Sequence, residues 1–175
     1  RTSTGHTPRD WQRTLGAEQG CSDRLIRIPT GFGKTLGVLG AWAYHRLVRG
    51  DARWPRRLVI ALPQRVLVEQ THAECERLLQ QSGLMAQGAE VSSQKAKLHL
   101  LMGGHQADRW HLEPEQPAVL IGTQDMLLSR ALNRGYASPR PRWPMEYALL
   151  NQDVLWVLDE VQLMGVGLTT SAQLQ

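Results

Sequence analysis

The feature that most constrains the fold is a glycine-rich turn between a short apolar run and an amphipathic segment. The turn spans residues 29–35 (PTGFGKT), directly after the apolar run at 25–28. Apolar residues after the turn recur every three or four positions up to about residue 49, the spacing of a helix. The sequence therefore predicts a short strand over 25–28, a tight turn, and a helix over 34–49.

The residue types in this turn are those that a bound triphosphate needs. Glycine is required where backbone N–H groups must point inward around an anion, and the start of the next helix adds further N–H groups and a favourable dipole. Lys34 is expected to reach the β- and γ-phosphates, and the Thr35 hydroxyl to ligate Mg²⁺. Ile28 departs from the strict pattern, which has glycine or alanine six residues before the lysine. The predicted ATP contacts from the turn are Thr30, Gly31, Phe32, Gly33, Lys34 and Thr35.

Apolar runs and turn residues alternate along the rest of the chain. Strands are predicted at residues 57–62, 98–102, 118–121 and 154–158, helices at 65–81 and 123–132, and surface loops at 103–117 and 134–144. This alternation favours an α/β fold with a mainly parallel sheet between two layers of helices. A chain of 175 residues suits one such domain, and no apolar run is long enough to span a membrane.

An acidic pair, Asp159 and Glu160, follows the last predicted strand. Parallel α/β sheets bind their ligands at the carboxyl ends of the strands, so the pair is placed to meet the phosphate turn. Asp159 is the candidate for holding Mg²⁺ through its water shell, and Glu160 for the general base. Taken alone, such a pair is explained at least as well by a structural role, as the cap of a following helix. The phosphate turn about 125 residues upstream favours the catalytic interpretation.

Composition adds little. The formal net charge of +4 fits a polyanionic partner, but a compositional bias of the host genome toward arginine codons would give the same number of arginines. Cys21 and Cys75 show no metal-ligand spacing and are expected to be two reduced thiols. His105 and His111 fall in a predicted loop and are expected to be solvated.

Together these motifs resemble those of superfamily 2 helicases. The segment 31–35 resembles motif I, and residues 159–162 (DEVQ) resemble motif II, with Gln162 where His or Asp is usual. Trp11-Gln12 resembles the glutamine element, which implies that Gln12 reads the adenine edge. The resemblance implies a RecA-like P-loop NTPase domain of three layers that uses ATP and Mg²⁺.

Two further segments extend the resemblance to nucleic-acid contacts. Residues 62–70 resemble motif Ia and residues 122–127 resemble motif Ib, which line the groove for a single strand in this family. Gln64, Arg65 and Thr123 would then bind the sugar–phosphate backbone without reading its sequence. Arg65 is also explained as a solvated helix start, and Thr123 as a helix N-cap.

The amino-acid sequences of three segments are most similar to those of the CRISPR-associated helicase–nuclease of type I systems, in its type I-U (I-G) branch. These segments lie at 102–104 (MGG), 121–125 (IGTQD) and 158–165 (LDEVQLMG). The resemblance implies antiviral defence in the cytoplasm, movement along single-stranded DNA, and recruitment by the CRISPR surveillance complex. Residues 1–175 are expected to form the first RecA-like domain only, without the second RecA-like domain or the HD nuclease. The isolated chain is then expected to bind ATP weakly and hydrolyse it very slowly.

Two other interpretations remain open. One is a different superfamily 2 motor, such as an RNA helicase or a restriction translocase. The other is a truncated module that binds nucleotide or nucleic acid without catalysis.

Overall fold

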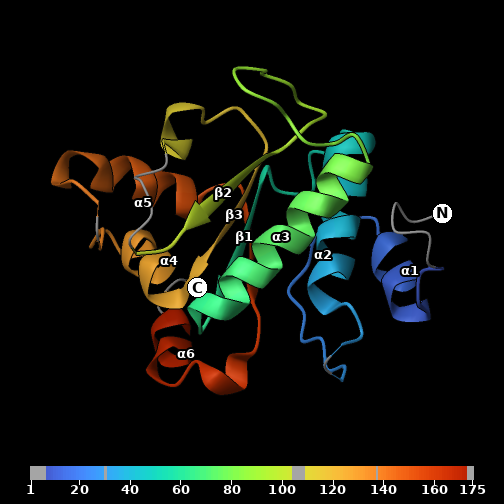
Figure 1. The fold of residues 1–175 in the computed structure, drawn as a ribbon, viewed down its shortest axis with the longest axis horizontal. Coiled ribbons are helices and arrows are strands. Elements are labelled where there is room, and N and C mark those ends of the chain that lie inside the picture. Colours follow the sequence, from blue (N-terminus) through green and yellow to red (C-terminus); the bar gives the residue numbers. More distant parts are fainter. Residues whose placement is uncertain (1–6, 30, 104–108, 137, 173–175) are drawn as a thin grey trace.

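Four parallel strands form the centre of the protein in a computed structural model, which describes residues 7–29, 31–103, 109–136 and 138–172. The sheet order is β2-β3-β1-β4 (Figure 1), and the strands are β1 (Arg57–Leu62), β2 (Lys97–Leu101), β3 (Ala118–Thr123) and β4 (Val154–Leu158). All four strands correspond to predicted ones within two residues. The α/β class with a parallel sheet is therefore confirmed.

Helices cover both faces of this sheet, because alternate strand residues point to opposite sides. Leu58, Ile60 and Leu62 of β1 join one buried cluster, while Val59 and Ala61 join another. The helices of the first cluster lie on the right of Figure 1 and those of the second on the left. The first layer holds α1 (Asp10–Gly16), α2 (Lys34–Ala43) and α3 (Arg65–Gln81), and the second holds α4 (Gln124–Ala131), α5 (Trp143–Asn151) and α6 (Val166–Ser171).

The helix after the glycine-rich turn widens at its end, which the sequence did not predict. α2 continues into a π-helical turn, Tyr44–Val48. The turn contains the buried His45, whose ring stacks on Trp54 at 4.5 Å between centroids. The Nε2 atom of His45 lies 2.9 Å from the carbonyl oxygen of Gly16, so this turn also fixes the end of α1.

α3 has the predicted bounds and buries the face that carries Val68, Cys75 and Leu79. Cys75 lies on this face with no exposed surface, and both Cys75 and the half-buried Cys21 are free thiols, as expected. Burial raises the pKa of Cys75 to about 12 and also raises the pKa of Cys21 above its ordinary value. Only a thiolate reacts readily, so both thiols are protected in the folded protein.

Thiol labelling at neutral pH is therefore expected to distinguish the two cysteines. Cys21 should react slowly in the native protein, and Cys75 only after unfolding in denaturant. A Cys21→Ser variant provides the control, because it should show no reaction until it is unfolded. Rapid labelling of native Cys21→Ser protein would contradict the packing of α3 on the sheet.

The strand predicted over residues 25–28 is wrong. Residues 21–29 have no regular secondary structure, and Leu25 is 77% exposed. A strand needs a neighbour for its backbone hydrogen bonds. Among the described residues the sheet ends at β4, so this segment has no paired strand.

The two predicted loops contain structure that the sequence did not reveal. Trp110–Leu112 forms a 3₁₀ turn with buried Trp110 and His111, so the expected exposure of His111 is wrong, while His105 lies outside the described residues. Trp110 is apolar enough to join the core beneath β3 and carries His111 inward with it.

In the second loop, α5 begins at Trp143, because Pro144 stands in the first helical turn, where proline is favoured. Within the described ranges, no helix is both long and apolar enough to cross a bilayer.

Candidate nucleotide and nucleic-acid site

The glycine-rich turn leads into α2 through two glycines with left-handed backbone. Gly31 has φ 80° and Gly33 has φ 68°, a region that residues with a Cβ rarely adopt. Gly33 is the N-cap of α2 and supplies no side-chain hydrogen bond to the first turn of the helix. The opening N–H groups of α2 are therefore not capped by a side chain, as the predicted anion site requires. Thr30 lies outside the described residues.

The two predicted Mg²⁺ ligands are brought together. The Oγ1 atom of Thr35 donates a hydrogen bond of 2.5 Å to Oδ2 of Asp159, across 124 residues of sequence. Asp159 is fixed at this position because its N–H bonds the carbonyl oxygen of Ala61 and so continues the pairing of β4 with β1. A hydroxyl and a carboxylate are hard oxygen donors of the kind that Mg²⁺ prefers. The residues present therefore fit this ion.

Glu160 is held in an unusual backbone conformation beside this pair. Its φ is 54°, in the left-handed region that a residue other than glycine enters at an energetic cost, often at functional sites. The Oε1 atom of Glu160 lies 3.6 Å from Nζ of Lys34, and Oε2 accepts a hydrogen bond from Nε2 of Gln162. The Glu160 N–H bonds Oδ1 of Asp159 at 2.9 Å. Lys34, the predicted base Glu160 and Gln162 thus form one chain of contacts.

α1 packs directly on the phosphate turn. The Nε2 atom of Gln12 donates a hydrogen bond of 3.2 Å to the carbonyl oxygen of Gly33, and its Oε1 accepts one of 3.0 Å from the N–H of Arg9. The Arg9 guanidinium lies 4.1 Å from the centre of the Phe32 ring. Gln12 is therefore next to the predicted nucleotide site, and Arg9 is a residue that sequence reasoning missed.

The closest contact between α1 and α2 also escaped the sequence. A Cβ atom on Gly37 would lie 2.3 Å from the Trp11 ring, so this position on α2 admits only glycine without a shift. α1 also borders an open cavity of ≈420 Å³, whose other wall is residues 24–28. Apolar side chains line much of it, including Leu15, Ile26 and Ile28. No local sequence signal marks either feature, because both depend on how α1 folds back.

The predicted nucleic-acid contacts lie on the same edge of the sheet as Asp159. Gln64 and Arg65 follow β1 and are exposed, and Thr123 ends β3 opposite Leu62. The Nη2 atom of Arg65 donates a hydrogen bond of 2.6 Å to the carbonyl oxygen of Gly103, just after β2. Thr123 stands at the N-cap position of α4 but makes no capping hydrogen bond with its side chain. Gln64, Arg65 and Thr123 therefore form a polar rim at the ends of β1 and β3, and the Gly103 carbonyl joins it from the end of β2.

Gln124 connects this rim to the segment after the acidic pair. Its Nε2 atom donates a hydrogen bond of 3.2 Å to the carbonyl oxygen of Met164. A Cβ atom on Gly167 would lie 2.2 Å from the Gln124 Oε1 atom, so the glycine leaves room for this contact. Gln124 belongs to the predicted motif Ib, but its link to residues 164–167 could not be foreseen from the sequence.

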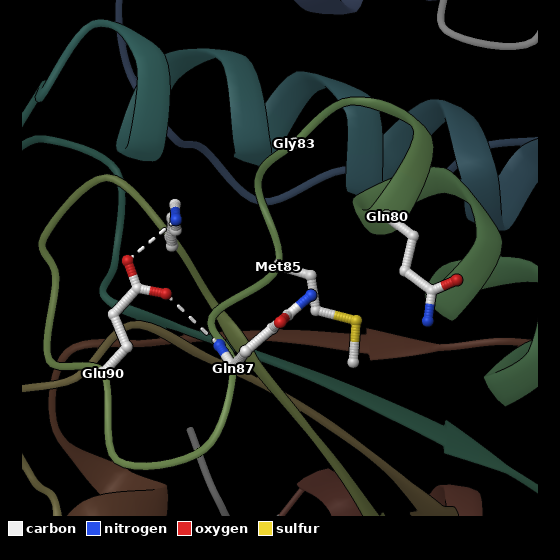
Figure 2. A pocket seen from close by; sticks show the side chains of 6 residues that line it. Gln80, Gly83, Met85, Gln87 and Glu90 are labelled. Atoms are coloured by element: carbon white, nitrogen blue, oxygen red, sulfur yellow. Dashed lines mark hydrogen bonds and ion pairs between the residues drawn. The ribbon is translucent and has the colours of Figure 1, made fainter.

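A separate hollow of about 280 Å³ lies at the opposite end of the sheet, near the start of β2. Figure 2 shows Gln80, Met85, Gln87 and Glu90 around it. The Glu90 carboxylate accepts hydrogen bonds from Nζ of Lys95 at 2.7 Å and from the Gln87 N–H at 3.3 Å, and these lower its pKa. Charged groups here already pair with each other, and the predicted site residues lie elsewhere.

A four-stranded parallel sheet with helices on both faces defines this chain as a RecA-like α/β domain. The family model described as DEAD/DEAH box helicase matches residues 11–174, and the chain belongs to this superfamily 2 family. A domain of this family is a nucleic-acid-dependent ATPase motor, and its members use ATP, normally with Mg²⁺. No curated protein and no solved structure matches the chain.

Proposed function

We propose that this chain is the ATP-binding domain of a helicase that moves along single-stranded DNA. The observation that carries the proposal is the contact between Thr35 and Asp159, which joins the phosphate turn to the acidic pair at 2.5 Å. Two predicted halves of one site meet there from distant parts of the sequence. The DEAD/DEAH family supplies the class of motor, and the choice of DNA rests on the resemblance of the individual motifs.

Each site residue has a proposed role in binding ATP. The backbone from Thr30 to Gly33 would surround the phosphates, and Lys34 would pair with the β- and γ-phosphates after it leaves Glu160. Thr35 and Asp159 would hold Mg²⁺, an ion that neutralises charge on the phosphate oxygens when bound. Gln12 would meet the adenine edge beside the apolar cavity at α1.

Glu160 is the proposed general base of hydrolysis. A base must lie within hydrogen-bond reach of the attacking water, next to the γ-phosphate. The 3.6 Å contact of Glu160 with the lysine that would bind this phosphate supports the proposal, because it would put the carboxylate beside the γ-phosphate. Gln162 holds the other carboxylate oxygen and would fix its direction.

The nucleic acid would lie along the polar rim formed by Gln64, Arg65 and Thr123. The exposed Gln64 and Arg65 and the half-buried Thr123 would offer hydrogen bonds and charge to a sugar–phosphate backbone. Such contacts are independent of base sequence, as a motor that moves along its track requires.

At the finest level, the proposal is a CRISPR-associated helicase that acts in antiviral defence in the cytoplasm. It rests on the sequence resemblance of residues 102–104, 121–125 and 158–165 to that family. The partner would be the CRISPR surveillance complex. In this proposal residues 1–175 are the first RecA-like domain and act together with a second one. Stimulation of the full-length ATPase by single-stranded DNA rather than RNA would support it, and the reverse would favour an RNA helicase.

The test of the nucleotide site is a Lys34→Ala variant. Lys34 would make charged hydrogen bonds to phosphate, each worth about 1.5–3 kcal/mol, so the affinity for ATP with Mg²⁺ should fall about 10- to 100-fold. Titration with a fluorescent ATP analogue measures this affinity. Lys95→Ala is the matched control, because Lys95 pairs with Glu90 at the far end of the sheet. Unchanged affinity in Lys34→Ala would refute the assignment of the phosphate turn.

A further inference from the structure

A basic and aromatic surface lies between α4 and α5, away from the rim at the strand ends. We propose that it is a second contact surface for single-stranded nucleic acid. The choice of this ligand rests on the proposed function, but the location does not. We call it the arginine–tyrosine surface, and its residues are Arg134, Tyr136, Arg140, Arg142 and Tyr147.

Trp143 holds this surface together. A Cβ atom on Gly135 would lie 2.1 Å from the Trp143 ring, so the ring packs directly on the backbone between Arg134 and Tyr136. Its Nε1 atom donates a hydrogen bond of 2.8 Å to the carbonyl oxygen of Ser138. The Arg140 guanidinium lies 5.9 Å from the ring centre, within the range of a cation–π contact. The loop and the start of α5 are therefore one packed unit.

The exposed charge on this unit is entirely positive. The only carboxylate between residues 132 and 149 is Glu146, which is 2% exposed. Glu146 points inward to the buried Arg130, with 3.6 Å between Oε2 and Nε. Arg134 and Arg140 are exposed on the outside. Burial of the one acidic group leaves a local field that attracts a polyanion.

Two tyrosines stand among these arginines. Tyr136 is 63% exposed and Tyr147 is 44% exposed, and Tyr147 follows Trp143 by four residues on the same face of α5. Exposed aromatic rings next to arginines stack the bases of a single strand while the guanidinium groups bind its phosphates. Duplexes do not offer unstacked bases, so the combination favours a single strand.

α4 connects the polar rim to the arginine–tyrosine surface over a length that a few nucleotides can span. α4 begins after Thr123 on the rim and ends at Ala131, and the loop is tied to it by a hydrogen bond of 2.8 Å from the Arg134 N–H to the Ser129 carbonyl oxygen. Eight helical residues span about 12 Å, which is about four nucleotide steps at 3.4 Å. A strand bound at the rim would therefore reach the arginine–tyrosine surface within a few nucleotides.

The charge is tested with the double variant Arg134→Ser/Arg140→Ser and a fluorescein-labelled oligothymidylate, by anisotropy at several salt concentrations. Each lost phosphate contact should flatten the slope of log K against log salt by about 0.7, or about 1.4 for both. The affinity at about 0.1 M salt should fall about 25-fold by the same relation. Arg49→Ser/Arg77→Ser removes the same charge from exposed positions elsewhere and should leave the slope unchanged. Equal slopes for the wild type and the first variant would overturn the proposal.

Stacking is tested separately with Tyr136→Ala. Its affinity for the oligonucleotide should fall about fivefold or more, and an abasic strand of the same length should bind both proteins equally. Tyr44→Ala, at an exposed ring on the π-helical turn, is the control. If polyglutamate competes as well as the oligonucleotide at equal charge, the surface binds acidic protein and the proposal fails.

Arg65→Ser separates this inference from the proposed function. Weaker binding in Arg65→Ser alone would retain the rim and reject the arginine–tyrosine surface. Weaker binding in Arg134→Ser/Arg140→Ser alone would retain the arginine–tyrosine surface and reject the rim. A wild-type chain that binds no oligonucleotide would reject both surfaces, while the ATP site would still be judged by Lys34→Ala.

Discussion

Replacing Glu160 with glutamine is expected to lower the rate of ATP hydrolysis by about 10²- to 10⁴-fold, the usual contribution of a general base. Glutamine has the same shape but cannot accept a proton from the attacking water. The affinity for ATP should not fall, because the variant also removes the carboxylate that lies 3.6 Å from Lys34 and would compete with phosphate for it. Loss of turnover with retained binding is the signature of a residue that acts on the chemical step.

Single-turnover release of labelled phosphate, with protein in excess over ATP, measures even a slow rate. Glu113→Gln is the matched control, because Glu113 also pairs with a lysine, Lys97, but lies far from the phosphate turn. It should hydrolyse ATP at the wild-type rate. If Glu160→Gln did the same, the base would have to be another group, and the chain of contacts through Gln162 would be structural.

The second large effect is expected from Gly37→Ala. The new methyl group would lie 2.3 Å from the Trp11 ring, a distance that real contacts do not show, so the Trp11 side chain or α1 must shift. Overpacking of this kind costs about 1–3 kcal/mol. Since α1 also carries Gln12, which bonds the Gly33 carbonyl, the phosphate turn would lose its support, and the affinity for ATP should fall with stability.

Gly40 offers a close comparison three residues along the same helix. Nothing lies within 4 Å of a Cβ atom at this position. Gly40→Ala should therefore stabilise the protein by about 0.5–1 kcal/mol, because alanine favours the helix. Urea unfolding gives both free energies. A Gly37→Ala protein as stable as Gly40→Ala would show that α1 does not pack on α2 as described.

Regular elements of this fold were predictable wherever a strong apolar pattern decided them locally. The helix Arg65–Gln81 and the strand Val154–Leu158 have the predicted bounds, because their burial follows directly from periodicity. The approach of Asp159 to Thr35 was predicted from the rule that parallel strands share one carboxyl edge, although only Asp159 follows a strand of this sheet. The roles of these residues in binding ATP remain predictions.

The remaining features depend on neighbours that are remote in sequence. Residues 25–28 have the composition of a strand but no adjacent strand, and the backbone partner decides. The packing of Trp11 on Gly37 and the link from Gln124 to Met164 depend on how separate elements meet. α5 was not predicted, because Pro144 was assigned to the end of a surface loop although proline is also favoured in a first helical turn.

β4 is the outermost described strand on its side of the sheet, and each of its five residues is only half-buried. One row of its amide and carbonyl groups bonds β1, and the opposite row faces outward. This strand is followed directly by Asp159 and Glu160. A polypeptide that paired with the outward row would therefore extend the sheet beside the strand that carries both carboxylates.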